Sequence, residues 1–294
     1  MRRLGTGLFL SDAGLYKAPA ARSRENPSSP TSRLRGSAAR SLLYDGIERN
    51  LSMAVTLSVV VPVKDEAENV EPLAREIAAA VAGEAAPELI FVDDGSTDST
   101  AAVLKALKTS LPLLRVISHG RNTGQSRAVR TGVRAARADI VVTLDGDGQN
   151  DPADIPPLVA ILRDGADAAR IGLVQGVRAR REDNVQKRVA SRLANRFRRW
   201  MLNDVATDAG CGLKAFRRDE FLALPYFDHM HRYMVALFLR EGSEVRFVEV
   251  NHRPRLHGAS KYGVIDRALV GVNDLLGVRW LQKRFRGVLD PKEL

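Results

Sequence analysis

The stretch "DIVVTLDGDGQ", residues 139–149, decides the fold expected for this chain. A short apolar run leads into a polar segment in which Asp145, Asp147 and Gln149 occupy every second position. An apolar run bounded by turn residues is typical of a strand buried in a parallel sheet. Because side chains two apart on an extended chain point the same way, the pattern predicts two carboxylates and an amide oxygen presented together at a strand end.

The same alternation of apolar strand, polar turn and helix precedes this stretch. Strands are expected at residues 56–63, 88–96 and 114–120, and helices at 67–83, 98–110 and 124–138. Continuous apolar strands separated by amphipathic helices indicate βαβ units. The expected fold class is therefore α/β, with a mostly parallel sheet covered by helices on both faces. Ligands of such sheets bind outside the carboxyl ends of the strands, where the polar turns fall.

The second half is less regular. We expect a helix near 230–242, a strand at 244–255, and amphipathic helices at 185–202 and 264–285. The 185–202 segment is rich in Arg and Lys, and two interpretations stay open. Its apolar positions pack on the core while the basic residues are solvated, or it lies on an anionic membrane and delivers a lipid phosphate. Trp280, in the terminal segment, suits a membrane interface.

Composition limits the class of protein. The chain has 294 residues, a formal charge of +10 and a pI near 10.1, which indicates an anionic partner. Nucleic acid is disfavoured because aromatic residues make up only 5% and no nucleic-acid module is recognisable. A single cysteine, Cys211, excludes a disulfide framework and a cysteine zinc site, and it fits a reducing, cytosolic setting. No apolar window is long enough for a spanning helix, so membrane contact is expected to be peripheral.

Two motifs predict a nucleotide and metal site. Asp145 and Asp147 would repel each other unless a cation lies between them, and oxygen ligands suit Mg²⁺ or Mn²⁺. In "VDDGSTDST", Ser96, Thr97 or Asp98 can cap the next helix, and the segment is then capping chemistry alone, or Asp93 accepts hydrogen bonds from a base or ribose. The alternative for the "DGDGQ" segment is a polar β-turn. Neither GxxxxGK[ST] nor GxGxxG is present, which disfavours ordinary NTPases and dehydrogenases.

Taken together, several segments resemble the family 2 glycosyltransferases with a GT-A fold, and within them the dolichyl- or polyprenyl-phosphate mannosyltransferase group. The segments are "VVVPVKDEAEN", "FVDDGSTDST", "RNTGQSRAVRTGVRAARAD", "LDGDGQNDPADIP", "GVRARRED", "KRVASRLANRF", "DAGCGLKAFRR" and "RPRLHGASKYG". The resemblance covers roughly Leu57 to Arg286. It implies a GT-A domain at 53–263 and a C-terminal amphipathic helical segment at 264–294. Residues 1–52, rich in Arg, Ser, Pro and Ala, are expected to be a disordered basic arm or a mis-called start before Met53.

The resemblance also implies roles for individual residues. The donor-binding residues would be Pro62, Asp65, Glu66, Asp93, Asp94, Asp145 and Ser260. The metal ligands would be Asp147 and Gln149, and the acceptor phosphate would meet Arg178, Ser191 and Lys187 or Arg188. The catalytic residues would be Asp145, Asp147, Arg255 and Lys261, the last two clamping the phosphates together with Ser260.

Two departures from the family pattern matter. The first strand ends in "PVKDE", where the family has Pro-x-Tyr-Asn-Glu, so Lys64 replaces the tyrosine and the identity of the base stays open. The acceptor arginine four before the serine is Lys187, which moves part of that role to Arg188.

The implied activity is a metal-dependent, inverting transfer of mannose from GDP-mannose to a polyprenyl or dolichyl phosphate at the cytoplasmic face of the membrane. A phosphate is already nucleophilic near neutral pH, so the site must neutralise charge rather than supply a base. The alternative is a UDP-sugar donor with a lipid carrier or a glycan hydroxyl as acceptor, and a hydroxyl would need a base such as Asp208. A separate membrane subunit that anchors the chain, and a non-catalytic nucleotide-sugar sensor, also stay open.

Overall fold

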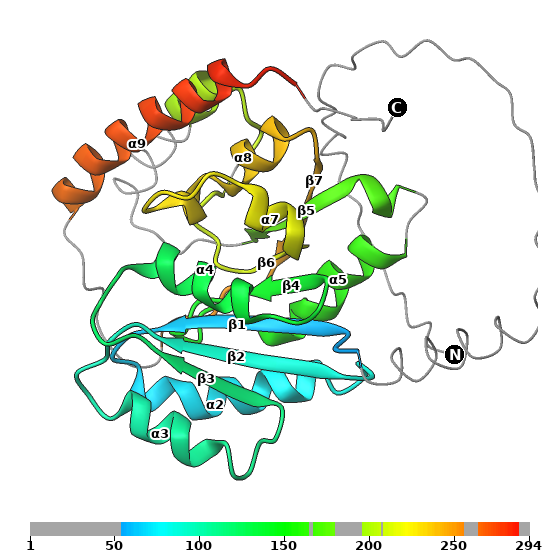
Figure 1. Cartoon of the computed structure of the whole chain (residues 1–294), viewed down its shortest axis with the longest axis vertical. Helices are drawn as coiled ribbons and strands as arrows, with labels where there is room; N and C mark the ends of the chain where they lie inside the picture. Colours follow the sequence, from blue (N-terminus) through cyan, green and yellow to red (C-terminus); the bar gives the residue numbers. More distant parts are fainter. Residues whose placement is uncertain (1–53, 165–166, 180–195, 207, 256–263, 288–294) are drawn as a thin grey trace, which may run out of the picture.

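The computed structural model describes residues 54–164, 167–179, 196–206, 208–255 and 264–287, the first seven residues of the last range by backbone alone (Figure 1). Their centre is a seven-stranded sheet in the order β3-β2-β1-β4-β6-β5-β7. The strands are β1 (Leu57–Val63), β2 (Pro87–Asp93), β3 (Leu114–Ser118), β4 (Ile140–Thr143), β5 (Ile171–Arg178), β6 (Lys214–Arg217) and β7 (Glu244–Val250). Only β6 runs antiparallel to its neighbours, β4 and β5. The predicted α/β class with a mostly parallel sheet is confirmed.

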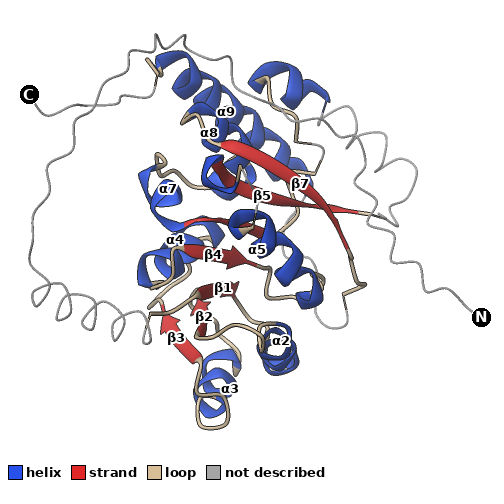
Figure 2. Ribbon diagram, turned by 90° about the vertical axis from the view of Figure 1, so that its right-hand side faces the viewer, coloured by secondary structure: helices blue, strands red, loops and turns tan. Residues whose placement is uncertain are grey.

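Helices cover both faces of the sheet (Figure 2). One face packs against α2 (Ala67–Ala80), α3 (Thr100–Leu107) and α5 (Ile155–Arg163). The other packs against α4 (Gln125–Ala135), α7 (Arg218–Ala223), α8 (Met234–Arg240) and α9 (Val264–Arg284). The alternation of β1 explains the two layers, because Val59 and Val61 belong to the first core and Val60 to the second. Short 3₁₀ turns lie at η1 (Pro152–Asp154), η2 (Ala168–Arg170) and η3 (Met230–Arg232).

The strands and helices expected before residue 140 are confirmed with ends shifted by a few residues. One detail of the decisive stretch was wrong. β4 ends at Thr143, so Asp145 to Gln149 lie in a turn and not on an extended strand. Gly148 has φ of +73°, a left-handed conformation that ends the extended chain and that glycine adopts without strain. The polar side chains therefore share a region through the turn and not through strand alternation.

The helix α9 packs on α8 and belongs to the second core. Leu275 and Val278 are buried there, and the Tyr233 hydroxyl donates to the carbonyl of Gly271 at 3.1 Å. Its opposite side exposes Val272, Leu276 and Trp280 by 50 to 57%. Apolar residues thus lie on two sides of α9, unlike the simple amphipathic pattern expected.

The 185–202 helix lies only partly within the described residues, of which 196–202 are helical. Gln282 of α9 donates to the carbonyl of Leu202 at 2.8 Å, so the two helices meet at their carboxyl ends. On this short helix Phe197 and Trp200 are exposed by 47 and 77%, with ring centroids 5.9 Å apart. None of the described helices combines the length and the apolar character needed to cross a bilayer.

Candidate active site

Six strands end, and the reversed strand β6 begins, on one edge of the sheet. This edge carries the predicted polar turns after β1, β2, β3 and β4. It also carries Arg178 at the end of β5 and Lys214 at the start of β6. The topology therefore brings to one place residues that are more than 100 positions apart in the sequence.

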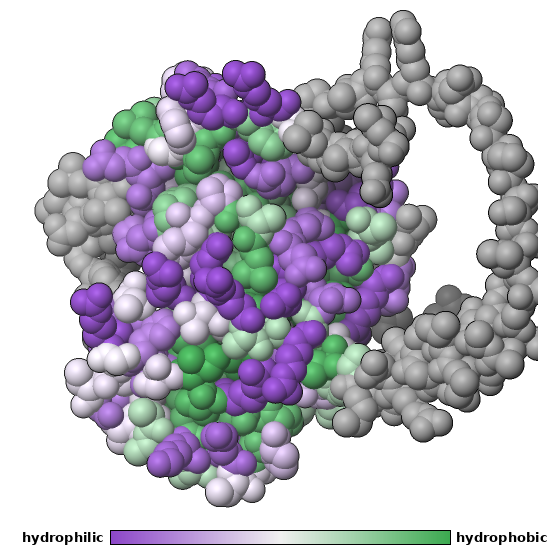
Figure 3. All heavy atoms as spheres, viewed as in Figure 1, coloured by the Kyte–Doolittle hydropathy of each residue, from purple (hydrophilic) through white to green (hydrophobic). Residues whose placement is uncertain are grey.

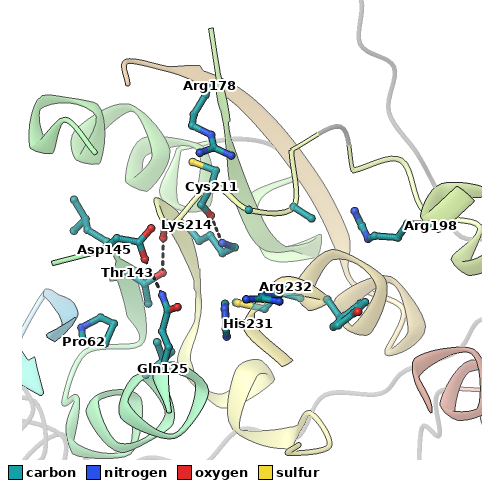
Figure 4. A pocket seen from close by; sticks show the side chains of 17 residues that line it. Pro62, Gln125, Thr143, Asp145, Arg178, Arg198, Cys211, Lys214, His231 and Arg232 are labelled. Atoms are coloured by element: carbon teal, nitrogen blue, oxygen red, sulfur yellow. Dashed lines mark hydrogen bonds between the residues drawn. The ribbon is translucent and has the colours of Figure 1, made fainter. Parts of the chain in front are cut away.

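Asp145 lies at the centre of this edge and lines a cavity of about 380 Å³ (Figure 4). Its carboxylate accepts a hydrogen bond of 2.8 Å from Gln125 of α4, and its backbone N–H donates to Asn150. Burial and the neighbouring charge of Asp147 raise the pKa of Asp145, against the lowering effect of nearby cations. The carboxylate is therefore positioned by α4 and electrostatically strained by its partner in the motif.

Asp147 pairs with a cation from the segment after β7. Nη2 of Arg255 lies 2.6 Å from Oδ2 of Asp147, and 3.9 Å from Oε1 of Glu66. The other carboxylate oxygen of Asp147 accepts from the backbone N–H of Gln149 at 3.2 Å. The Gln149 amide in turn donates to the carbonyl of Arg253 at 3.4 Å. The predicted metal ligands and the predicted phosphate clamp are thus in contact.

The predicted donor-binding residues after β1 form their own network. Asp65 has φ of +50°, and one of its oxygens accepts from the backbone N–H of Thr97 at 2.6 Å. Its other oxygen pairs with Lys64 at 2.8 Å. Glu66 accepts from the side-chain amide of Asn69, while Pro62 lines the cavity. The end of β1 is therefore fastened to the turn that follows β2.

The two acidic residues at the end of β2 are both buried. Asp93 accepts from the backbone N–H of Ser96 and from the hydroxyl of Ser118, each at 3.0 Å. Asp94 pairs with His119 at 2.8 Å and also accepts from the backbone N–H and the hydroxyl of Thr123. Burial acts to raise the pKa of Asp94, but these hydrogen bonds outweigh it and the pKa is lowered. Both carboxylates therefore hold the loops that line this edge.

Arg178, at the end of β5, also lines the cavity. Its Nε and Nη2 each donate to a carboxylate oxygen of Asp208 at 2.6 Å, a bidentate pair that fixes the guanidinium. Of the other residues expected at the acceptor and the clamp, five lie outside the described residues. They are Lys187, Arg188, Ser191, Ser260 and Lys261.

Several residues that line the cavity were not predicted from the sequence: Gln125, Arg198, Lys214, His231 and Arg232. Lys214 is buried, its ammonium contacts the carbonyl of Cys211, and burial lowers its pKa. His231 accepts from or donates to the Ser126 hydroxyl at 2.7 Å, and burial lowers its pKa well below the usual value. Lys214 sits inside the quoted "DAGCGLKAFRR" segment, which was the one signal that pointed to it.

Comparison with known proteins agrees with this geometry. The model of the family described as glycosyl transferase family 2 matches residues 58–222. The chain belongs to glycosyl transferase family 2. One solved structure with a similar fold is that of glucosyl-3-phosphoglycerate synthase from Mycobacterium tuberculosis, in complex with Mn²⁺, UDP and glucosyl-3-phosphoglycerate. It superposes with a TM-score of 0.57 at 25% identity, covering 81% of this chain and 82% of that one. The GT-A-like sheet predicted from the sequence is thereby confirmed.

Two curated relatives act on lipid carriers. The dodecaprenyl-phosphate galacturonate synthase of Rhizobium johnstonii is 34% identical over 235 residues, which are 78% of this chain and 68% of the relative. An undecaprenyl-phosphate 4-deoxy-4-formamido-L-arabinose transferase of Pseudomonas aeruginosa is 36% identical over 215 residues, which are 71% of this chain and 61% of the relative. The matched part of the chain thus spans about two thirds of the length of these relatives.

The donor set fits a divalent metal that shares its ligands with a substrate. Asp145 and Asp147 are close enough for one charge to raise the other's pKa, which a hard cation between them would relieve. Within the described residues, no group of three or more His, Cys, Asp or Glu side chains is arranged to hold a metal ion. Mg²⁺ is commonly bound by one or two carboxylates, with phosphate oxygens and water completing its shell. Two carboxylates and an amide oxygen are therefore enough.

Proposed function

We propose that this protein transfers one sugar from a nucleotide-diphosphate donor to a polyprenyl phosphate, with inversion at the anomeric carbon. The observation that carries the proposal is the meeting, at one sheet edge, of the Asp145 and Asp147 carboxylates with Arg178 and Arg255. Anionic oxygen ligands and cations side by side suit a reaction between two phosphorylated substrates. The two relatives named for polyprenyl-phosphate sugar transfer support the same acceptor.

For the donor we favour a UDP-sugar over GDP-mannose. The curated relatives are named for galacturonate and for formamido-arabinose transfer, and the solved neighbour binds UDP. None of these names supports the mannose preference that the resemblance implied. We keep Pro62, Asp65, Glu66 and Asp93 as the donor-binding residues, because they surround the end of β1 where a nucleoside would meet the sheet edge. Lys64 and Asp65 stand where the family has tyrosine and asparagine, and the base specificity depends on them.

The chain's own residues supply binding and charge. A bound Mg²⁺ or Mn²⁺, held by Asp147 and Gln149, would neutralise the leaving diphosphate. Arg255 is placed to exchange its pair with Asp147 for a donor phosphate oxygen. Arg178, fixed by Asp208, offers its remaining guanidinium nitrogen to the acceptor phosphate. Bringing two anions together in line with the anomeric carbon is the main contribution of such a site.

A glycan hydroxyl is the less favoured acceptor. It would need a general base, and Asp208 was the expected candidate. Both of its carboxylate oxygens accept hydrogen bonds of 2.6 Å from Arg178, so both are already engaged and poorly placed to take a proton from a hydroxyl. A phosphate needs no base, so the same geometry favours the lipid phosphate.

We further propose that the outer sides of α9 and the 196–202 helix rest on an anionic membrane. Their exposed apolar side chains are Phe197, Trp200, Val272, Leu276 and Trp280. Exposed basic residues accompany them, including Arg199, Lys283 and Arg284, and the Arg284 guanidinium lies 5.7 Å from the Trp280 ring centroid. In Figure 3 apolar side chains lie along the α9 side of the molecule, and hydrophilic ones gather at its carboxyl end. This mixture is typical of helices that lie at a lipid interface.

The test is release of nucleoside diphosphate from UDP-glucose, UDP-galacturonate and GDP-mannose, with and without polyprenyl phosphate, in Mg²⁺ or Mn²⁺ and in EDTA. We expect release that requires lipid and metal with at least one UDP-sugar and that disappears in Asp147→Asn. Release that ignores the lipid would contradict the acceptor, and release from GDP-mannose alone would contradict the donor. The Asp164→Asn variant, an exposed carboxylate at the end of α5, is the matched control.

A further inference from the structure

The cavity beside Asp145 is lined by more cationic than anionic side chains among the described residues. Its cationic lining residues are Arg178, Arg198, Lys214 and Arg232, and Asp145 is the carboxylate among the described residues that line it (Figure 4). They come from four separate elements: the end of β5, the 196–202 helix, the start of β6 and η3. A concave site with convergent cations is the usual form of an anion-binding pocket.

Two of the four cations form an ion pair with one carboxylate each. The pairs are Arg178 with Asp208 and Arg198 with Asp204, while the Lys214 ammonium contacts the carbonyl of Cys211. Arg232 forms no ion pair with a described residue. Its charge acts to lower the pKa of Asp274, but that carboxylate already pairs with His229 at 3.2 Å.

The environment of Arg198 also indicates an anion-binding site. Its side chain is 11% exposed, and Nη2 donates to Asp204 at 2.5 Å. Its Nε and Nη1 are buried and find no acceptor among the described residues. These two atoms carry three N–H groups, and buried donors without partners are rare and costly. In Figure 4 Arg198 extends toward the cavity from the side opposite Asp145, and Arg232 lies between them.

We propose that Arg198 and Arg232 form the binding site for an oxyanion of one of the two substrates, apart from the donor diphosphate. A carboxylate and a phosphate both match the planar donor fork of a guanidinium. Two sources share this chemistry: the carboxylate of an acidic sugar, such as a uronic acid, and the phosphate of the lipid acceptor. The inference rests on the proposed function, because both sources are substrates of that reaction. Arg198 and Arg232 then determine which sugar or which acceptor the enzyme accepts.

The test compares the wild type with Arg232→Gln and Arg198→Lys. Arg232→Gln removes a charge that has no ion-pair partner among the described residues, so the fold should tolerate it. Arg198→Lys keeps a positive charge for the buried Asp204 but loses the fork. Arg134→Gln, an exposed arginine of α4 that does not line the cavity, is the matched control.

Each variant is titrated calorimetrically with UDP, UDP-galacturonate, UDP-galactose and a short polyprenyl phosphate in Mg²⁺, and KM is measured for each substrate. If the oxyanion is the sugar carboxylate, both variants weaken UDP-galacturonate by about tenfold or more and leave UDP-galactose unchanged. If it is the acceptor phosphate, both weaken the lipid by a similar factor with either donor.

Two results would overturn the inference. In one, both variants match the wild type and Arg134→Gln in every titration. In the other, both lose UDP itself to the same extent as every other ligand, which would show a damaged fold and no local site. Because binding is measured directly, a wild type that turns over none of the donors would refute the proposed function and still leave the titrations to decide this site.

Discussion

Nη2 of Arg255 lies 2.6 Å from Oδ2 of Asp147, so a guanidinium holds the carboxylate that the family resemblance assigns to the metal. The pair is only partly exposed, with 26% of the Arg255 side chain and 13% of the Asp147 side chain accessible. A divalent ion bound at Asp147 would therefore compete with Arg255 for one carboxylate. The donor diphosphate, which offers new partners to both, would resolve the competition.

The first prediction follows from this pair. Arg255→Gln should bind Mn²⁺ about fivefold more tightly than the wild type in the absence of nucleotide, because a competing cation is gone. The same variant should turn over more slowly, because its phosphate contact is lost. Mn²⁺ titration followed by electron paramagnetic resonance measures the first effect. Arg253→Gln, which loses pairs with Glu76 and Asp151 instead, is the control and should leave Mn²⁺ affinity unchanged. Equal affinities in Arg255→Gln and the wild type would contradict the competition.

Gly212 supports the second prediction, because a Cβ there would lie 2.3 Å from Oδ2 of Asp145. Gly212→Ala must displace this carboxylate from its hydrogen bond with Gln125. We expect turnover to fall at least about tenfold, since small displacements of catalytic groups are costly. Gly277→Ala in α9, where nothing lies within 4 Å, should keep full activity and gain up to about 1 kcal/mol of stability. Steady-state kinetics and thermal melts of the two variants measure turnover and stability. Full activity in Gly212→Ala would show that Asp145 need not be held in this position.

A third prediction concerns pH. Burial, together with Arg232, Lys214 and His229, lowers the pKa of His231 well below its usual value of 6.5, so the folded state keeps this imidazole neutral while the unfolded state protonates it. The unfolded state then binds more protons below the ordinary pKa, and stability is lost as the pH falls. When the pH is lowered from about 7.5 to about 5.5, His231 should therefore reduce the free energy of unfolding by about 1.4 kcal/mol.

In His231→Asn the amide oxygen can replace Nδ1 as partner of the Ser126 hydroxyl. Over the same pH range this variant should lose about 1.4 kcal/mol less stability than the wild type. Urea unfolding at both pH values measures the difference. Identical pH dependence in the two proteins would mean that the imidazole is solvated and not buried.

The fourth prediction tests membrane contact. Replacing Trp200 and Trp280 together by Ser should weaken binding to vesicles containing anionic lipid by about tenfold or more, because two exposed aromatic anchors are removed. Lys108→Ser, at the end of α3 far from α9 in Figure 1, changes a charge without touching that surface. Vesicle sedimentation at low and at physiological salt is the measurement. Unchanged sedimentation of the double variant would assign the exposed apolar residues to another partner.

The first half of the fold was well predicted because strands such as Leu57–Val63 are buried on both faces. Their sequences are nearly continuously apolar and lack the helical period that would favour a helix. The strands β5 and β6 were not predicted. Leu173 is buried, but the run around it is interrupted by Gly172, Gln175 and Gly176, which breaks the apolar signal. The predicted alternation of Asp145 and Asp147 was right in bringing the two together and wrong in its cause, since glycines bend the chain where a strand was expected.

The cavity residues were missed for a different reason. Arg198, Lys214 and Arg232 come from three elements whose proximity depends on the antiparallel placement of β6. No local pattern reports such a placement. Arg198 belongs to the basic 185–202 segment, where a solvated charge is the ordinary outcome.

The reversed strand β6 has one more consequence, for engineering. Because β5 ends and β6 begins at the cavity, the chain leaves the sheet after Arg178 and enters it again at Lys214, at neighbouring points marked by the pairing of Gln175 with Lys214. The intervening sequence contains Lys187, Arg188, Ser191 and Arg198, and the flanking strands contribute Val174 and Ala215 to the first core. The segment can therefore be exchanged as a cassette: grafting the corresponding segment of a polyprenyl-phosphate sugar transferase between Arg178 and Lys214 should transfer the substrate preference that this segment carries, while the strands β1 to β4 stay unchanged.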